Sequence, residues 1–366
     1  MLTSDFDYNL PKELIAQKPA EPRDHSRLMV IDRKNHAVEH CNFFDLPSFL
    51  KPGDLLVWNN SKVFKARFKG VVELDEEVSG IKSDDAGDII LNFPRVEIFL
   101  LRPMENPGVW KALAKPGRKL RLGMRVRFAE DFACEVLIKD ADGTVLVQFN
   151  EDDLSVRNKA NLYGEVPTPP YVKIDQPSGK DLSEQYQTVY AKVEGSVAAP
   201  TAGFHFTPEL IEKLKEMKVE FAEITLHVGL GTFLPVKTKK IEEHKMHAEW
   251  VELTDKNADL INRAKAEGRR VIAVGTTTVR ALEAVAEKTS EDRLRAFNGE
   301  VNIFILPGYK YKIIDALITN FHLPKSTLLM LVSAFIGDRE FVLNCYAEAI
   351  KQNYRFYSFG DAMLIA

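Results

Sequence analysis

The stretch RRVIAVGTTTVRALEAVAEK, residues 269–288, decides the fold class, because it reads as a strand, a short polar turn and a helix in direct succession. The apolar run VIAV stands between two arginines and Gly275, as expected of a short strand. In VRALEAVAEK the apolar residues recur at helical spacing. A strand that leads directly into a helix is the repeating unit of α/β proteins.

The sequence on both sides continues this alternation. Thr207 and Pro208 mark the start of a helix, as a capping residue and a first-turn proline, and VEFAEITLHVG follows as a strand. A helix near 255–267 ends at Gly268. A strand, two helices and a closing strand are expected, in that order, at 314–321, 326–335, 339–353 and 362–365. We therefore expect an α/β fold with a mostly parallel sheet covered by helices.

A different pattern occupies residues 63–149, which read as short, evenly spaced strands separated by Gly, Pro and Asn/Asp clusters. Such spacing favours a small antiparallel β-barrel. The residues before Val63 belong with the α/β pattern, so the barrel is expected to be an insertion. The expected domains are a discontinuous α/β catalytic domain, 1–61 and 151–366, and an inserted β-barrel domain with a basic face, 62–150. The acidic stretch 74–88 is expected to form a long loop or hairpin extension.

Composition limits the broad class of protein. Hydrophobic residues make up 45% and charged residues 28% of the chain, which is typical of a globular protein. The longest apolar runs, such as Leu328 to Ile336, are too short to span a bilayer, and no signal peptide is evident, so we expect a cytoplasmic location. Cys41, Cys134 and Cys345 lie too far apart for a zinc ribbon or a sequence-local iron–sulfur site, and reduced, buried thiols are expected.

The net charge of −4, from 49 basic and 53 acidic residues, does not by itself indicate a nucleic-acid binder. Two expected barrel strands nevertheless alternate apolar with cationic residues, which gives each strand one apolar and one cationic face. On neighbouring strands these charges would repel unless an anion such as a phosphate backbone screened them. The alternative is a solvated edge, where lysine discourages strand pairing. The candidate RNA-binding residues are Lys65, Arg67, Lys69, Lys119, Arg121, Arg125 and Arg127.

Polar residues gather where the expected strands end, which is the edge where open α/β sheets bind ligands. Thr276 and Thr277 begin the helix after Gly275, where free N–H groups suit a carboxylate or phosphate. Arg280 lies near the same positive helix end, where its own charge is mildly unfavourable, and this suggests an anionic ligand. The alternative is a threonine cap, with Arg280 paired to Glu283.

Asn320 and His322 lie at the end of the expected strand 314–321, although a lone histidine is more often a structural, hydrogen-bonded one. Small residues surround Thr201, Gly203 and His205, which indicates either close approach of a ligand to the backbone or tight packing.

The segment LHVGLGTF, which contains Gly229, is weak evidence for a phosphate loop, because it lacks the remaining glycine and the lysine of the known motifs. His244 and His247, followed by Glu249, have a spacing that suits a metal. That spacing is common by chance and no HExxH accompanies it, so no metal is expected.

Together these segments resemble one family, the S-adenosylmethionine:tRNA ribosyltransferase-isomerases of queuosine biosynthesis. The resemblance covers nearly the whole chain, in the ordered blocks FDYNLPKELIAQKPAEPRDHSRLMV, GDLLVWNNSKVFKAR, YQTVYAKVEGSVAAPTAGFHFT, LHVGLGTFLPV, MHAEW, VIAVGTTTVRALE, TNFHLPKSTLLMLVSAF and YRFYSFGDAMLI. The chain departs from the family pattern at Ser61, Thr168 and Phe204, and its acidic stretch 74–88 is longer than the family core requires.

The resemblance implies a β-barrel inserted in an α/β domain, with S-adenosylmethionine as co-substrate and tRNA as partner. The ribosyl moiety is transferred and isomerised onto 7-aminomethyl-7-deazaguanine at the wobble position, giving epoxyqueuosine-tRNA, adenine and methionine. The chain is expected to act as a monomer, with no metal and no membrane.

This chemistry needs groups that exchange protons near neutral pH, and histidine is the natural choice. Within the resembling blocks, His205, His227 and His322 are the candidate catalytic residues, with base and acid unassigned. Binding of an anionic group, such as the methionyl carboxylate, is expected of Thr276, Thr277 and Arg280. Thr201 and Asn320 are candidates for orienting the ribose or the deazaguanine, and Gly203 and Gly229 complete the candidate binding residues.

Two other classes remain open from the residues alone. An RNA-binding module without chemistry would not need the dense polar strand ends of the larger domain. A methyltransferase would use the same co-substrate, but the glycine-rich fingerprint is missing. The products separate these classes, because methyl transfer leaves S-adenosylhomocysteine whereas ribosyl transfer leaves adenine and methionine.

Overall fold

A computed structural model gives the fold of the 366-residue chain. It describes residues 1–73, 82–83, 89–90, 94–140, 143–167, 171, 182–229, 236, 238–244, 246, 248–289 and 293–366. The chain forms two compact units, one of Met1–Lys62 with Pro169–Ala366 and one of Val63–Thr168. Much of the acidic stretch 74–88 lies outside the described residues, so the expected loop is not tested.

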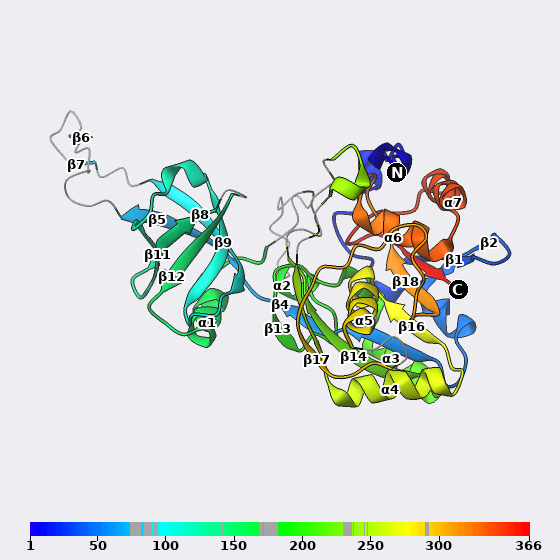
Figure 1. Ribbon diagram of the computed structural model, residues 1–366. Helices are drawn as coiled ribbons and strands as arrows, with labels where there is room; N and C mark the ends of the chain where they lie inside the picture. Colours follow the sequence, from blue (N-terminus) through cyan, green and yellow to red (C-terminus); the bar gives the residue numbers. More distant parts are fainter. Residues whose placement is uncertain are drawn as a thin grey trace. The chain divides into compact units, whose positions relative to one another are not determined.

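The first unit is built on a nine-stranded sheet with the order β17-β15-β14-β3-β16-β18-β19-β1-β2 (Figure 1). The strands are β1 (Arg27–Asp32), β2 (Ala37–Asn42), β3 (Leu55–Asn59), β14 (Glu220–His227), β15 (Glu249–Leu253), β16 (Val271–Val274), β17 (Phe297–Val301), β18 (Ala316–Asn320) and β19 (Ala362–Ile365). Strands β4 (Ser61–Val63) and β13 (Val193–Ser196) form a separate ribbon. The expected strands of the α/β pattern are all present.

The expectation of a mostly parallel sheet is wrong, because the sheet is mixed. Strands β14, β3, β16 and β18 run parallel to one another, but β15, β17, β19 and β2 each pair antiparallel with a neighbour. The four residues between β1 and β2 are too few for the crossover that a parallel pair requires. Two successive helices separate β18 from β19, whereas a parallel βαβ unit uses one. Alternation along the sequence does not reveal these reversals.

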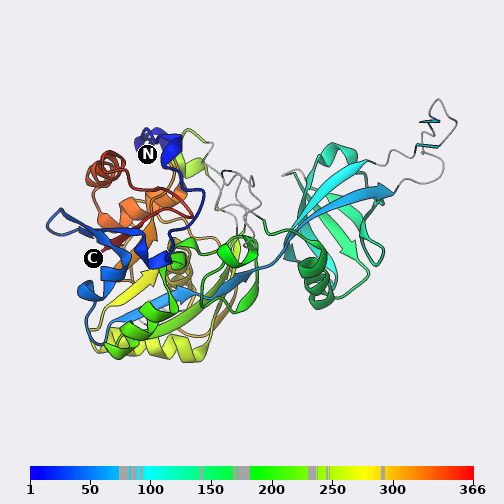
Figure 2. The same cartoon turned by 180° about the vertical axis from the view of Figure 1, so that it is seen from behind.

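Helices cover both faces of the sheet (Figures 1 and 2). Alternate residues of β3 face opposite cores: Leu55 and Val57 pack in one hydrophobic cluster, Leu56 and Trp58 in the other. The first cluster includes residues of α4 (Asp255–Ala266), α5 (Thr276–Thr289), α6 (Thr327–Ile336) and α7 (Arg339–Lys351). The second includes residues of α3 (Pro208–Glu216), whose cap Thr207 accepts from the Leu210 amide as predicted.

The second unit is a closed six-stranded barrel with the order β10-β11-β12-β9-β8-β5. Its strands are β5 (Arg67–Glu73), β8 (Arg95–Pro103), β9 (Val109–Lys115), β10 (Arg125–Ala129), β11 (Phe132–Lys139) and β12 (Thr144–Phe149). Every neighbouring pair is antiparallel, as predicted. A helix that the sequence did not reveal, α1 (Asp153–Tyr163), packs at one end of the barrel in Figures 1 and 2. A further short ribbon is formed by β6 (Lys82–Ser83) and β7 (Ile89–Ile90).

One expected barrel strand is much shorter than predicted. The stretch 119–128 forms a strand only from Arg125, because a 3-10 turn, Gly117–Lys119, and a bend with Gly123 at φ 77° precede it. Leu122, expected inside the barrel, is 65% exposed as a result, while Leu120 anchors the turn in the interior. The apolar face of the first strand is confirmed, since Phe64 and Phe68 are buried.

Two smaller expectations concern cysteines and membranes. Cys134 and Cys345 are buried free thiols, as expected, but Cys41 is only half-buried. In the part of the chain that the structure describes, no helix has the length and apolar character needed to cross a bilayer.

Candidate active site

The four mutually parallel strands bring their carboxyl ends to one edge of the sheet. Here β14 ends at His227, β3 at Asn59, β16 at Val274 and β18 at Asn320. Two of the polar clusters singled out in the sequence, around Thr276 and around Asn320, lie at the ends of these strands. The rule that open α/β sheets bind ligands at this edge therefore applies to the parallel centre of the sheet, although the sheet as a whole is mixed.

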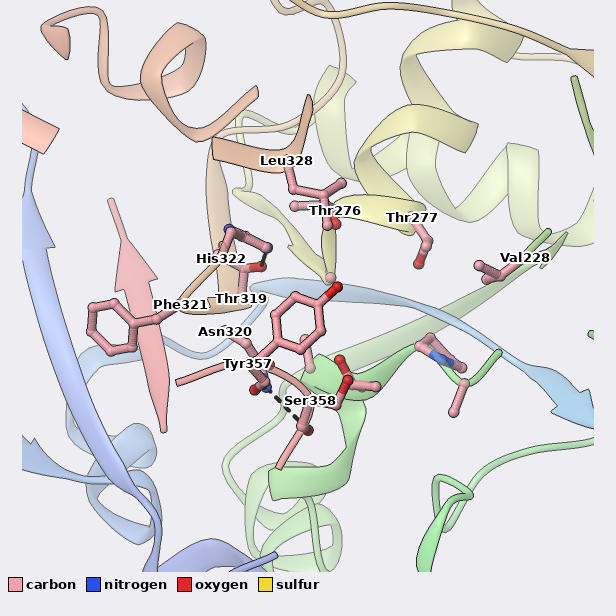
Figure 3. Close-up of a pocket in the computed structure, with 15 residues that line it drawn as sticks. Val228, Thr276, Thr277, Thr319, Asn320, Phe321, His322, Leu328, Tyr357 and Ser358 are labelled. Atoms are coloured by element: carbon pink, nitrogen blue, oxygen red, sulfur yellow. Dashed lines mark hydrogen bonds between the residues drawn. The ribbon is translucent and has the colours of Figure 1, made fainter. Parts of the chain in front are cut away.

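A pocket opens at this edge (Figure 3). Its walls come from the segment before α3, the end of β14, the start of α5, the end of β18 and the segment before β19. The lining residues are Ala199, Pro200, Thr201, Ala202, Val228, Gly275, Thr276, Thr277, Thr319, Asn320, Phe321, His322, Leu328, Tyr357 and Ser358. The structure thus brings five of the predicted site residues, Thr201, Thr276, Thr277, Asn320 and His322, into one pocket.

Asn320 is held on the pocket wall by contacts on both ends of its amide. Its Nδ2 donates to the carbonyl oxygens of Tyr357 at 2.8 Å and Ser358 at 3.3 Å. Its Oδ1 therefore faces His205 Nε2, 3.4 Å away, and must accept from it. The other ring nitrogen of His205, Nδ1, lies 2.7 Å from Ser26 Oγ. Both nitrogens of His205 are thus engaged by protein groups, and His205 lies behind Asn320.

His322 lines the pocket, and its tautomer follows from Tyr346. The Tyr346 hydroxyl accepts from the His322 amide at 3.2 Å and lies 3.3 Å from His322 Nδ1. Because the phenol proton needs an acceptor, Tyr346 donates to Nδ1. The ring proton of neutral His322 is then on Nε2, which lies 3.3 Å from Thr319 Oγ1, the contact dashed in Figure 3.

Both buried histidines are neutral at physiological pH. Burial lowers the pKa of His205 from 6.5 to about 4, because the imidazolium form is poorly solvated there. Burial likewise lowers the pKa of His322 from 6.5 to about 3. Each ring therefore acts first as a neutral hydrogen-bonding group.

His227 lies at the end of β14, outside the pocket lining. Its Nδ1 is 2.8 Å from Ser61 Oγ, and its ring stacks on Trp250 with a centroid distance of 5.2 Å. A side chain at Gly195 would meet the His227 ring at 2.5 Å, so only glycine fits beside it. The ring is half-buried, unlike the other two histidines. Three separate segments thus fix its position.

The start of α5 presents donors that the described protein leaves unsatisfied. Thr277 Oγ1 is buried and has no hydrogen-bond partner among the described residues. Arg280, one turn further on the same side of the helix, is 5% exposed and pairs through Nη1 with Glu249 Oε2 at 2.5 Å. Its Nε and Nη2 are buried and find no partner within the described ranges. Such unsatisfied donors are costly unless a ligand or water accepts from them.

The pairing of Arg280 with Glu283, considered from the sequence, is wrong. The Glu283 carboxylate accepts instead from the backbone amides of Lys312, Ile313 and Ile314, and from Tyr309. This leaves Glu249, which is distant in sequence, as the counter-ion of Arg280. Glu249 Oε1 also accepts from the Gly229 amide at 3.3 Å, so Gly229 is linked to the Arg280 ion pair.

The structure distinguishes the two interpretations of the small-residue stretch around Thr201 and Gly203, which are ligand contact and tight packing. Thr201 lines the pocket, close to the start of α5. Gly203 does not line the pocket, and a Cβ there would lie 1.9 Å from the Tyr190 hydroxyl. Tight packing within the protein therefore accounts for the glycine at this position.

Most cations on the barrel strands have acidic partners. Arg67 and Lys69 contact Glu165 at 2.9 and 2.7 Å. Arg125 and Arg127 contact Glu73 at 3.5 and 2.9 Å. Strands β5 and β10 are neighbours, as the argument from like charges required, but the register places Glu73 directly opposite Arg125. Carboxylates of the barrel, rather than an external anion alone, therefore screen these charges. The remaining candidates, Lys65, Lys119 and Arg121, lie outside β5 and β10.

Sequence reasoning missed several residues of the site. Tyr357 lines the pocket, and its φ of 73° is rare for a residue other than glycine, which marks local strain. Ser358 lies beside it, and the Ser358 hydroxyl is 2.5 Å from the Tyr171 hydroxyl. Both residues occur in the block YRFYSFGDAMLI. Its dense aromatic and polar residues before the final strand were the signal from which these two pocket residues could have been predicted.

The residues that the structure describes contain no group of three or more metal-ligating side chains. The sequence candidate included His247, which lies outside the described residues.

The chain thus has an open α/β sheet with a polar pocket at the carboxyl ends of its parallel strands, together with a separate barrel unit. This arrangement is typical of α/β enzymes that bind small molecules. Residues 3–365 match the family model described as queuosine biosynthesis protein, and the chain belongs to that family.

Relatives and a solved structure agree with this membership. The chain is 48% identical over 366 residues to the S-adenosylmethionine:tRNA ribosyltransferase-isomerase of Thermotoga petrophila, covering 100% of both chains. It is 50% identical over 365 residues to the protein of that name from Carboxydothermus hydrogenoformans, again covering 100% of both. The crystal structure of S-adenosylmethionine tRNA ribosyltransferase from Thermotoga maritima superimposes with a TM-score of 0.55 and 38% identity, covering 99% of this chain and 100% of that one.

Proposed function

We propose that this chain transfers and isomerises the ribosyl moiety of S-adenosylmethionine onto 7-aminomethyl-7-deazaguanine at the tRNA wobble position. The products are epoxyqueuosine-tRNA, adenine and methionine. Full-length identity of 48–50% to relatives named for this activity supports the proposal. The structural observation that carries it is the pocket at the strand ends, where the buried Thr277 hydroxyl lacks a protein partner among the described residues.

The reaction makes three chemical demands on the pocket. The sulfonium acidifies the C5′ hydrogens of the sugar, and a base must remove one of them. Adenine leaves as the sugar rearranges, so a donor to one of its nitrogens lowers the barrier. The acceptor amine must then be uncharged to attack C1′. A buried site with fixed, neutral hydrogen-bonding groups suits all three steps.

The start of α5 is the proposed site for the methionyl carboxylate. The helix N-terminus carries partial positive charge, and Thr276 and Thr277 face the pocket. Arg280 adds a buried guanidinium whose one pairing, to Glu249, leaves two nitrogens available. A carboxylate bound here, with Gly229 linked to the same ion pair, would satisfy donors that otherwise cost free energy.

His322 is proposed as a neutral donor rather than as the base. Tyr346 fixes its ring proton on Nε2, and the low pKa keeps the ring uncharged. A neutral imidazole N–H stabilises developing negative charge without carrying a full charge into the pocket, and triosephosphate isomerase uses a histidine in this way. The target of this donor is a ribose oxygen or a nitrogen of the departing adenine.

His205 is proposed as a positioning residue, because both its nitrogens contact protein groups and its Nε2 holds Asn320. Asn320 and Thr201 then orient the ribose or the deazaguanine from the pocket wall. Gly203 contributes through packing, since Tyr190 occupies the space of a side chain there.

His227 is the proposed base for the C5′ hydrogen. Its ring is half-buried and held by Ser61 and Trp250, whereas burial lowers the pKa values of His205 and His322 and so makes both weaker bases. In a His227→Ala variant, exchange of C5′ deuterium from labelled S-adenosylmethionine into water should stop. Exchange at the wild-type rate would exclude His227 as the base.

The two expected domains are proposed to divide the work. The α/β domain, 1–61 and 151–366, binds S-adenosylmethionine, and the barrel domain, 62–150, contributes cations to tRNA binding. The chain acts as a monomer in the cytoplasm, without a metal.

The test of this function is mass spectrometry of a reaction containing the protein, S-adenosylmethionine and tRNA that carries the aminomethyl-deazaguanine. Adenine and methionine should appear in equal amounts with a matching mass gain on the tRNA, and His322→Ala should suppress all three signals together. Appearance of S-adenosylhomocysteine would indicate a methyltransferase instead. Absence of every small product, with intact and bound tRNA, would contradict the enzymatic assignment.

A further inference from the structure

The connection between β9 and β10 forms a rigid, cationic projection of the barrel. We define the basic turn as residues 115–124, which run from the last residue of β9 through the 3-10 turn to the residue before β10. Within this turn the Leu120 side chain is buried. The Lys139 ammonium donates to the carbonyl oxygens of Gly117 and Leu120 at 3.0 and 3.1 Å. The Gly123 amide donates to Val136 O at 2.8 Å, which joins the turn to β11.

The cations of the basic turn differ from those of the strands. Arg118, Lys119 and Arg121 are exposed, and none has an ion pair within the described residues. The strand cations Arg125 and Arg127 share the carboxylate of Glu73. The whole chain has a net charge of −4, so an exposed set of cations that makes no ion pair within the described ranges is not a consequence of overall composition.

An aliphatic patch adjoins these cations. The pairing of β11 with β12 shifts between Val136 and Ile138, and such a bulge re-aims side chains. As a result, two consecutive apolar residues are exposed, Leu137 at 38% and Ile138 at 47%. Leu122, at the bend of the basic turn, is 65% exposed. Because Val136 also pairs with Gly123 and Met124, the turn and the patch form one surface.

From this surface we infer that the basic turn, more than the basic strands, is where the barrel contacts tRNA. The inference rests on the proposed function, in which tRNA is the substrate. Exposed cations without acidic partners can each neutralise a phosphate and release counterions, whereas a paired strand cation must first give up its carboxylate. The aliphatic patch fits the faces of unstacked bases or riboses, which single-stranded RNA loops expose beside their phosphates.

The experiment compares two triple variants of the full-length chain. The turn variant is Arg118→Ala, Lys119→Ala and Arg121→Ala. The control variant, Lys34→Ala, Lys213→Ala and Lys256→Ala, removes the same number of exposed cations from the other unit. Equal thermal midpoints establish that both are folded. Rates of adenine release are measured with each substrate varied, and tRNA binding is measured across a salt series.

The turn variant should raise the KM for tRNA by about 10- to 100-fold and reduce the slope of log affinity against log salt by about 2, for three lost contacts to a single strand. Its KM for S-adenosylmethionine and its kcat at saturating tRNA should match the control. A second variant, Leu122→Ser with Ile138→Ser, should raise the KM for tRNA without changing the salt slope.

Unchanged KM for tRNA and unchanged salt slope in the turn variant would overturn the inference. The inference would also be overturned if the wild-type chain bound vesicles of anionic phospholipid and the turn variant lost that binding but kept normal tRNA affinity. The basic turn would then be a membrane-binding surface. Failure of the proposed function is distinguishable, since the wild-type chain would then release no adenine.

Discussion

The pocket and the basic turn use polar groups in opposite ways. In the pocket, Asn320 and His322 are buried, and the contacts they make fix their orientation and tautomer. In the basic turn, Arg118 and Arg121 extend into solvent without acidic partners among the described residues. Electrostatic interactions are strong where water is excluded, and weak and salt-dependent where it is not. The pocket therefore suits chemistry on a small molecule, and the turn suits reversible contact with a polyanion.

This difference predicts how each region responds to change. Loss of one pocket group should act on turnover or on S-adenosylmethionine binding, because the remaining groups cannot move to replace it. Loss of turn cations should act on tRNA affinity, in small steps that depend on salt. The predictions below test this separation, from the largest expected effect to the smallest.

The largest effect is expected from His322→Ala. Removal of a preorganised donor costs about 10²- to 10³-fold in kcat when it stabilises charge in the transition state. The KM for tRNA should stay within about twofold of wild type by the same reasoning, since the turn is intact. Adenine release under saturating substrates measures the loss, and His36→Ala, in the exposed turn between β1 and β2, is the matched control.

A smaller loss of kcat is expected from Tyr346→Phe, which removes only the donor that fixes the His322 tautomer. A kcat for His322→Ala equal to that of the control would remove His322 from the chemistry.

An intermediate effect is expected from Thr277→Val, which removes the pocket hydroxyl with little change of volume. Loss of one hydrogen bond to a charged group costs about 1.5–3 kcal/mol, so the KM for S-adenosylmethionine should rise about tenfold or more. The matched control is Thr277→Ser, which keeps the hydroxyl and should behave nearly as wild type. Equal KM values for the two variants would exclude the hydroxyl from ligand binding.

The smallest effect is on stability and concerns the neutral histidines. Burial lowers the pKa values of His205 and His322 to about 4 and about 3, so between pH 6.5 and those values the unfolded chain binds more protons than the folded one. Stability is therefore intact above pH 6.5 and is lost as the pH falls, by about 1.4 kcal/mol per pH unit for each histidine. Urea unfolding at pH 6.5, 5.8 and 5.0 measures this slope.

In the same series, a His322→Gln variant should show a shallower pH slope than wild type, because one of the two titrating groups is gone. A slope identical to that of wild type would show that His322 is not buried in a neutral form.

Much of the fold was accessible from the sequence, because periodicity and capping are local. The cap at Thr207, the glycine that ends α4 and the closing strand 362–365 are all present where they were predicted. Strand direction was not accessible, since β19 enters the sheet antiparallel to β18 after two successive helices. The shortened strand β10 was missed because Gly123 bends a stretch whose alternation is otherwise that of a strand.

The candidate site followed a similar division. Residues at the carboxyl ends of parallel strands, such as Asn320 and Thr276, were found because strand ends converge in this fold class. The Arg280–Glu249 ion pair and the hydrogen bond between Tyr346 and His322 join residues that are far apart in the chain. Only the structure reveals these contacts. The acidic partners of the basic strands were missed for the same reason. The strand register places Glu73 opposite Arg125, and the chain after α1 brings Glu165 to Arg67.

The most direct test of the account is one series of steady-state measurements on wild type, His322→Ala and the triple turn variant, with S-adenosylmethionine and tRNA each varied. The account predicts that His322→Ala loses kcat while its KM for tRNA is kept, and that the turn variant loses tRNA affinity while its kcat is kept. The contradictory result is a loss of kcat in the turn variant with normal tRNA affinity, or a loss of tRNA affinity in His322→Ala with normal kcat.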